Sequence, residues 1–229
     1  KFLIGLSLDG PERFHNAFRR DAGGGPTFRR VMTSMETLKR HGVDFNILAC
    51  VNRETAKAPE EVYRFLRAHG SGFIQFVPIV ERSVEPAGED ALTLVAPDDP
   101  ADARVTEWSV RPRDYGFFLE TIFRLWARED VGKIFVQLFD TALEAWMGYE
   151  PSLCYFRSCC GDAMILEQNG DLYSCDHFVY PEHRLGNLLG TPLTGMAASP
   201  QQRAFGEAKR DRLPRQCREC PVLFVCHGE

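Results

Sequence analysis

Short apolar segments alternate with amphipathic segments in the first part of the chain. The apolar segments, residues 1–8, 44–51 and 72–80, are each short enough to form one buried strand. Residues 27–42 and 59–70 lie between them and carry apolar side chains at helical spacing, with helix-starting and helix-ending residues at their limits. This order predicts a parallel sheet whose strands are joined by right-handed helical crossovers.

Ligands bind at the carboxyl ends of the strands in sheets of this kind. By position alone the candidate residues are Ser7, Asp9, Cys50, Asn52, Gln75 and Val80. Three strands do not close a barrel, and an open sheet of three strands leaves its edges unpaired. We therefore expect further strands upstream of Lys1.

The middle of the chain has a different pattern. Residues 82–111 lose periodicity and gain proline and acidic residues, which is typical of a linker or a surface excursion. Two helices are then predicted, over residues 112–128 and 133–147, and we interpret their aromatic stripes as core packing. Further on, Ser199-Pro-Gln-Gln202 has the residues of a capped helix start, so a helix is predicted to run to about Arg210.

The strongest turn signal in the chain is Asn169-Gly170, because both residues tolerate the positive φ of a tight hairpin. A two-residue loop would place Gln168 opposite Asp171 and Met164 opposite Cys175. The sequence therefore predicts a short β-ribbon that ends at a cysteine.

Cysteines gather around this ribbon. Cys154 and Cys160 precede it and Cys175 closes it, so three thiolates are predicted to converge at its open end. Cys159 is a spare or a decoy beside them. Asp176 then lies immediately next to whatever these cysteines bind.

A second group, Cys217-x2-Cys220-x5-Cys226, means that seven of the eight cysteines fall in the last third of the chain. Metal or cluster ligation in a reducing compartment fits this number better than disulfides do. The second group suits structural zinc as well as a [4Fe-4S] cluster, because cysteine sulfurs at close spacing hold both. The Cys-x5-Cys-x14-Cys spacing of the first group is not that of a zinc finger.

Charge and hydropathy exclude some partners. The formal net charge is -5, and basic residues form no long run, so there is no electrostatic footprint for nucleic acid or an anionic membrane. No segment approaches the roughly eighteen consecutive apolar residues of a membrane-spanning helix. We therefore expect a soluble, cytoplasmic protein with no nucleic-acid partner and no membrane partner.

Several motifs are spread along nearly the whole chain. They are Ser7-Leu-Asp-Gly-Pro11 with His15-Asn-Ala-Phe-Arg19, Phe73-Ile-Gln-Phe-Val-Pro78, Cys175-Asp-His-Phe-Val179, Leu185-Gly-Asn187, and Leu213-Pro-x-x-Cys217 leading into the second cysteine group. Together they resemble the anaerobic sulfatase-maturating enzymes, which are radical S-adenosylmethionine enzymes with a SPASM auxiliary-cluster domain. The Cys-Asp-His-Phe-Val run is the most specific of these motifs, and residues 85–111 look like an insertion.

This resemblance implies an α/β fold and a division of the chain into three parts. Residues 1–82 would be the C-terminal part of a partial (β/α) TIM-like barrel, and residues 83–150 an insertion or linker with helices. Residues 151–229 would be an incomplete, Cys-rich SPASM domain containing the β-hairpin.

The implied reaction oxidises a Cys or Ser of a sulfatase to Cα-formylglycine. A radical-generating [4Fe-4S] cluster, held by a Cys-x3-Cys-x2-Cys loop, would cleave S-adenosylmethionine to a 5′-deoxyadenosyl radical that takes a Cβ hydrogen from the target. The substrate would be an unfolded or nascent sulfatase polypeptide. Flavodoxin or ferredoxin would supply electrons.

The resemblance also implies roles for individual residues. Cys154, Cys160 and Cys175 match ligands of the first auxiliary [4Fe-4S] cluster, and Cys217, Cys220 and Cys226 match ligands of the second. Asp176 matches the proton acceptor. Ser7 and Arg19 match contacts to S-adenosylmethionine, and Val80 does so by strand position.

The chain also departs from the family pattern. No Cys-x3-Cys-x2-Cys occurs in it, and each auxiliary group shows three thiolates without a fourth. We therefore expect an internal fragment that does not cleave the cofactor alone. Two alternatives stay open: a SPASM maturase acting on another ribosomal peptide, and a non-catalytic zinc-binding interaction module.

Overall fold

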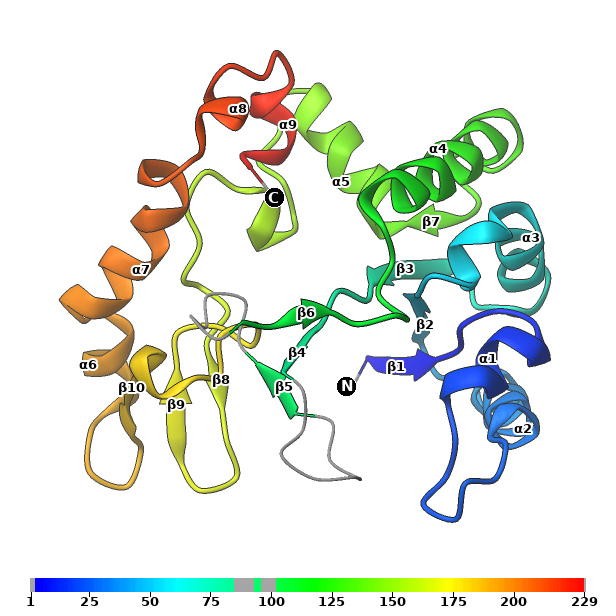
Figure 1. The fold of residues 1–229 in the computed structure, drawn as a ribbon, viewed down its shortest axis with the longest axis horizontal. Coiled ribbons are helices and arrows are strands. Elements are labelled where there is room, and N and C mark those ends of the chain that lie inside the picture. Colours follow the sequence, from blue (N-terminus) through cyan, green and yellow to red (C-terminus); the bar gives the residue numbers. More distant parts are fainter. Residues whose placement is uncertain (1–2, 85–92, 96–101, 229) are drawn as a thin grey trace. The chain divides into compact units, whose positions relative to one another are not determined.

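The computed structural model describes residues 3–84, 93–95 and 102–228. It divides into two compact units, residues 1–139 and 140–229, whose elements are labelled in Figure 1. None of the helices in the described ranges is both long enough and apolar enough to cross a lipid bilayer. The three-part division at residues 82 and 150 stays a prediction.

The first unit is built on a four-stranded parallel sheet in the order β1-β2-β3-β7. The strands are β1 (Ile4–Ser7), β2 (Phe45–Val51), β3 (Phe73–Pro78) and β7 (Phe135–Val136). The helical elements are α1 (Glu12–Phe18), α2 (Phe28–Arg40), the 3-10 turn η1 (Thr55–Lys57), α3 (Pro59–His69) and α4 (Pro112–Glu129). The predicted parallel α/β class is confirmed, whereas closure into a partial barrel stays a prediction.

The two faces of this sheet are covered differently. Along β2, Phe45, Ile47, Ala49 and Val51 are buried, and the residues between them are half-buried. The buried face packs in one core with side chains of α2, α3 and α4, which lie along that side of the strands in Figure 1. A fully covered face and a partly open face are expected where the open face holds a ligand.

The predicted helix over residues 133–147 is wrong at its start. Phe135 and Val136 form the short strand β7, which pairs with Phe73 and Ile74 of β3, and α5 (Gln137–Trp146) begins only after it. The rings of Phe73 and Phe135 stack with their centroids 4.9 Å apart. Pairing with the free edge of β3 decides the conformation here, and the local apolar pattern does not reveal a partner so distant in sequence.

The described part of residues 82–111 is not a linker or surface excursion, which corrects that prediction. Three antiparallel strands lie there, β4 (Arg82–Val84), β5 (Thr93–Val95) and β6 (Arg104–Val105), in the order β5-β4-β6. Val110 is buried, and its N–H donates to Ile79 O at 2.9 Å. Residues 85–92 and 96–101 of the predicted insertion lie outside the described residues.

The second unit combines a small antiparallel sheet with short helices. The sheet has the order β10-β9-β8, from β8 (Ile165–Leu166), β9 (Asp171–Tyr173) and β10 (Arg184–Asn187). The helical elements are η2 (Cys154–Phe156), η3 (Pro181–His183), α6 (Leu193–Ala197), α7 (Pro200–Asp211), α8 (Arg215–Arg218) and α9 (Leu223–Cys226). The predicted helix after Ser199 is confirmed, and Ser199 Oγ accepts the N–H of Gln202 at 3.1 Å.

The predicted hairpin is confirmed, but its register is wrong by one residue. Ile165 pairs with Tyr173, Leu166 pairs with Leu172, and the N–H of Glu167 donates to Asp171 O at 2.9 Å. The loop therefore has three residues, Gln168 to Gly170, and Gln168 is not opposite Asp171. Gly170 has φ +87, which is the left-handed residue that closes a three-residue hairpin loop.

Candidate functional site

The first cysteine group lies around the hairpin of the second unit. Cys154 opens η2, Cys160 follows it, and Cys175 comes two residues after β9 ends. Burial raises the pKa of Cys160, and it raises the pKa of Cys175 to about 11; the Cys154 sulfur adds to both shifts. Because one sulfur acts on the other two, the structure brings the three predicted ligands into one neighbourhood. All eight cysteines are free thiols, so none is committed to a disulfide.

The buried side chain of Gln202 on α7 holds two of these cysteine loops. Its Nε2 donates to Gly161 O at 2.7 Å and to Ser174 O at 3.1 Å. Gly161 follows Cys160 and Ser174 precedes Cys175, so one amide group sets the spacing of two predicted ligands. Gln202 is 3% exposed, and a buried carbonyl is costly to leave unpaired.

Two further residues of α7 complete this support. The backbone of Cys160 lies against Gly206 and donates its N–H to Gly206 O at 3.2 Å. One turn later, Lys209 Nζ donates to Arg157 O and to His227 O, both at 2.9 Å. Its charge also lowers the pKa of Cys160, against the larger upward effect of burial. The helix therefore braces the first cysteine loop and the end of the chain at once.

Asp176 is placed to act beside a cysteine ligand. Cys175 Sγ lies 3.3 Å from Asp176 Oδ1, and His177 Nδ1 lies 3.1 Å from the same oxygen. The Asp176 side chain is 60% exposed, so it is open to a polypeptide arriving from solvent. The donor atoms of Cys175, Asp176 and His177 lie within 4.8 Å of one another, as residues around a single ion would. A four-iron cluster places its cysteine sulfurs farther apart, because each sulfur binds a different iron.

The second cysteine group is wound into consecutive helical turns. Cys217 lies in α8, and its carbonyl accepts the N–H of Cys220 at 3.1 Å; Cys220 O in turn accepts from Leu223 at 3.2 Å. Cys226 ends α9, and His227 then takes the left-handed conformation with φ 48. Three thiols on short, tightly turned segments are a donor set that suits a thiolate-bound metal or cluster.

The predicted cofactor contacts lie in the first unit. Ser7 ends β1 beside Leu48 of β2, and Leu48 is flanked on its other side by Gln75 of β3. Arg19 follows α1 and donates from Nε and Nη2 to the carboxylate of Asp9, at 2.6 and 3.0 Å. Val80 lies past the end of β3 with 62% of its side chain exposed. Ser7, Arg19 and Val80 therefore all belong to the carboxyl edge of the sheet, where position alone predicted a site.

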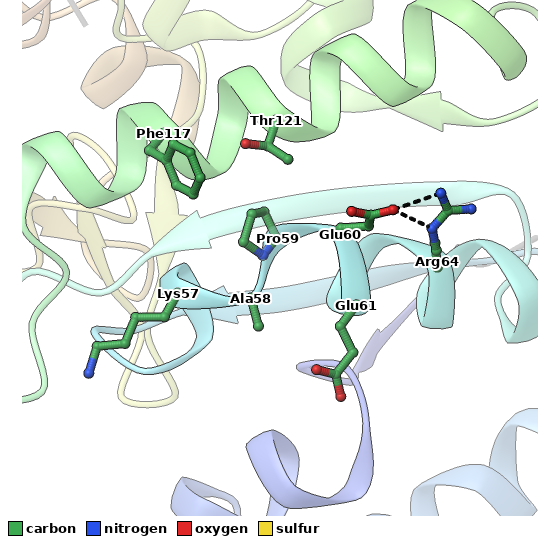
Figure 2. A pocket seen from close by; sticks show the side chains of 8 residues that line it. All are labelled: Lys57, Ala58, Pro59, Glu60, Glu61, Arg64, Phe117 and Thr121. Atoms are coloured by element: carbon green, nitrogen blue, oxygen red, sulfur yellow. Dashed lines mark hydrogen bonds and ion pairs between the residues drawn. The ribbon is translucent and has the colours of Figure 1, made fainter.

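The hollow drawn in Figure 2 lies elsewhere in the first unit. Its walls come from η1, the start of α3 and the side of α4. The lining residues are Lys57, Ala58, Pro59, Glu60, Glu61, Arg64, Phe117 and Thr121. Glu60 and Arg64 are already paired there, with Arg64 Nη2 2.7 Å from Glu60 Oε1. None of the predicted site residues lines this hollow, so it is no part of the candidate site.

The supporting residues were the part that sequence reasoning missed. Gln202 was recognised as a helix-start residue, but nothing local shows where its amide reaches. Asp9 was a candidate by strand position, and its role as the partner of Arg19 was not anticipated. The signal available in the sequence was only that both are polar side chains at positions the fold buries.

Comparison with known proteins identifies the second unit first. Residues 154–221 match the SPASM family, described as an iron-sulfur cluster-binding domain. The chain thus combines a parallel α/β unit with an iron-sulfur type of cysteine domain. Over its whole length it is homologous to anaerobic sulfatase-maturating enzymes.

Three relatives illustrate this homology. The serine-type anaerobic sulfatase-maturating enzyme of Bacteroides thetaiotaomicron is 44% identical over 228 residues, covering 100% of this chain and 55% of the relative. The cysteine-type enzyme of Clostridium novyi is 30% identical over 229 residues, covering 99% of this chain and 57% of the relative. The solved structure of native anSMEcpe with bound AdoMet has a TM-score of 0.84 at 28% identity, covering 100% of this chain and 58% of that one. The chain spans little more than half the length of these relatives.

Proposed function

We propose that this chain is part of a radical S-adenosylmethionine enzyme that oxidises a Cys or Ser of a sulfatase to Cα-formylglycine. The observation that carries the proposal is the gathering of Cys154, Cys160 and Cys175 beside an exposed Asp176, in a chain homologous throughout to sulfatase-maturating enzymes. A related structure contains both AdoMet and the Kp18Cys peptide, which supports a cofactor and a peptide substrate of those classes.

The cysteines would hold two auxiliary [4Fe-4S] clusters. Cys154, Cys160 and Cys175 would ligate the first, and Cys217, Cys220 and Cys226 the second, in keeping with the iron-sulfur description of the matching family. The thiol donor sets described above fit such clusters, and thiolates are the ligands that iron-sulfur clusters require. When bound, the clusters would accept electrons, and S-adenosylmethionine would be the source of the radical.

Asp176 would take the proton that the oxidised substrate loses. Conversion of an alcohol or thiol to an aldehyde removes a proton from its oxygen or sulfur, and a carboxylate within reach is a suitable acceptor. The position directly after Cys175 puts proton and electron acceptance side by side. The exposure of the Asp176 carboxylate leaves its second oxygen free to meet the peptide.

Ser7, Arg19 and Val80 would contact S-adenosylmethionine at the carboxyl edge of the parallel sheet. A guanidinium matches the carboxylate of the cofactor's amino-acid end, and a hydroxyl can donate to the same group. We propose an unfolded or nascent sulfatase polypeptide as substrate, flavodoxin or ferredoxin as electron donor, and the cytoplasm as location. The 44% identity to a serine-type enzyme favours serine as the target residue.

The test uses the full-length parent enzyme, purified without oxygen and reconstituted with iron and sulfide. Two sulfatase-motif peptides that differ only in Ser or Cys at the target position are incubated with S-adenosylmethionine and a reductant, with an Ala peptide as control. Mass spectrometry should show an aldehyde at the target position, with the Ser peptide converted faster. Deoxyadenosine release with both peptides unchanged would instead indicate a maturase of another peptide. A colourless protein lacking the broad absorption near roughly 400 nm would indicate zinc.

A further inference from the structure

Four residues at the carboxyl edge of the sheet form a closed ring of hydrogen bonds. The N–H of Asp9 lies 3.5 Å from His15 Nδ1, and His15 Nε2 lies 3.0 Å from Thr27 Oγ1. The Thr27 hydroxyl donates to Arg19 O at 2.8 Å, and the Arg19 guanidinium returns to the Asp9 carboxylate. The ring therefore holds Arg19 at its backbone and at its side chain together.

The direction of each bond in the ring follows from its donors. A backbone N–H can only donate, so His15 Nδ1 is the acceptor and the ring proton is on Nε2. That proton goes to Thr27 Oγ1, which leaves the hydroxyl proton for Arg19 O. His15 is fully buried, and burial lowers its pKa, which favours the single neutral tautomer the ring needs.

Thr27 shows that the ring is more than a by-product of helix capping. The residue directly precedes α2, where a threonine hydroxyl ordinarily accepts an N–H of the first turn. It makes no such bond, and Asn16 Oδ1 accepts the N–H of Phe28 instead, at 3.0 Å. The Thr27 hydroxyl is thereby left to join His15 to Arg19.

The ring is also anchored to the sheet and presents one charged group outward. Asp9, which is 2% exposed, accepts the N–H of Cys50 at 2.8 Å, tying the ends of β1 and β2 together. Arg19 Nη2 lies 3.2 Å from Cys50 Sγ. The Arg19 side chain keeps 28% exposure, and among the described residues its Nη1 has no hydrogen-bond partner.

We propose that Asp9, His15 and Thr27 are positioning residues that fix the Arg19 guanidinium to receive the carboxylate of S-adenosylmethionine. This rests on the proposed function, which makes Arg19 a cofactor contact. An arginine already held in its bound rotamer loses little conformational freedom when the ligand arrives, so its interaction is expressed as affinity. A ring that served only to brace residues 9–27 would stabilise the fold without a specific effect through Arg19.

The experiment measures the dissociation constant of S-adenosylmethionine for the full-length, cluster-reconstituted enzyme by anaerobic equilibrium dialysis. Thr27→Val removes the hydroxyl farthest from the expected ligand and keeps the side-chain shape. Thr27→Ser restores the hydroxyl. Thr33→Val is the matched control, because the exposed Thr33 hydroxyl also donates to a backbone carbonyl, that of Arg29 at 3.0 Å. Asp9→Asn is the second test variant, in case Thr27→Val does not fold.

Thr27→Val and Asp9→Asn should each raise the dissociation constant roughly three- to tenfold, while Thr27→Ser and Thr33→Val leave it unchanged. In an Arg19→Ala background Thr27→Val should have no further effect, since the effect acts through Arg19. Equal affinity of Thr27→Val and Thr33→Val, or the same weakening with and without Arg19, would overturn the inference while the proposed function stands. A wild-type enzyme that does not bind S-adenosylmethionine would refute the proposed function itself, and the inference with it.

Discussion

The backbone of Cys160 lies directly against Gly206, at the point where any larger residue on α7 would place its β-carbon. An added β-carbon would meet the carbonyl oxygen of Cys160 far inside contact distance, and this neighbour is backbone, which cannot rotate away. The absence of a side chain at Gly206 is therefore what lets the first cysteine loop approach the helix.

We expect Gly206→Ala to displace the Cys160 loop. Overpacking at a tight contact costs about 1–3 kcal/mol, which here outweighs the gain of about 1 kcal/mol that alanine offers within a helix. The variant should have a lower melting temperature and bind less iron per chain after reconstitution. Gly195→Ala on α6 is the control, since a β-carbon there meets nothing within 4 Å. Equal iron content in the two variants would contradict the role given to Gly206.

Replacement of Gln202 should separate ligand spacing from helix stability. Gln202→Met keeps the length of the side chain but leaves the carbonyls of Gly161 and Ser174 without this donor, at a cost of about 1–3 kcal/mol. We expect reduced iron loading together with a lower melting temperature. Gln201→Met is the matched control one residue away, because Gln201 is exposed and its bonds to Glu182 O and Arg184 O are longer, at 3.4 and 3.2 Å. Full iron loading in Gln202→Met would show that the cysteine loops keep their spacing without the amide.

These supporting contacts mark the limit of what the sequence predicts. The strands and helices of the first unit follow from hydrophobic period, because one face of each element must be buried. The bonds of Gln202 join residues 41 and 28 positions apart, and no local pattern encodes such a pairing. The two-residue strand at Phe135 was missed for the same reason, since its conformation depends on the edge of β3.

The candidate site divides in the same way. Cysteine spacing and the motif at Cys175 were enough to predict the ligand groups and Asp176. The hairpin register was wrong because Asn169-Gly170 fits loops of either two or three residues, and the left-handed Gly170 closes the longer one. Asp9 was a candidate by position, but its ring partners come from α1 and the residue before α2, which hydrophobic period does not place.

His15 should make stability depend on pH. Burial lowers the pKa of His15 below its ordinary 6.5, Asp9 acts in the opposite direction, and Arg19 adds to the lowering. The unfolded chain then binds a proton more readily than the folded chain, so the free energy of unfolding falls as the pH drops below about 6.5. The expected sign is a loss of stability on the acid side.

The measurement compares melting temperatures of the wild-type protein and His15→Gln from about pH 7.5 to about pH 5. Glutamine does not titrate, so the wild type should lose more stability than the variant across this range. The advantage of the wild type over the variant should therefore shrink as the pH falls. A difference between the two proteins that does not change with pH would rule out a neutral, buried His15.

Asp176→Asn tests the proton acceptor. The amide has nearly the same shape as the carboxylate but does not accept a proton, and loss of a general base lowers rates by roughly 10²- to 10⁴-fold. We therefore expect aldehyde formation on the sulfatase-motif peptide to fall by that factor, while iron content and S-adenosylmethionine affinity stay at wild-type values. Asp162→Asn is the control, because Asp162 is an exposed carboxylate of the same cysteine-rich unit, 83% exposed and 3.5 Å from Arg157. Aldehyde yields that match between the two variants would remove Asp176 from the reaction, and a loss of iron in Asp176→Asn alone would make it a structural neighbour of Cys175.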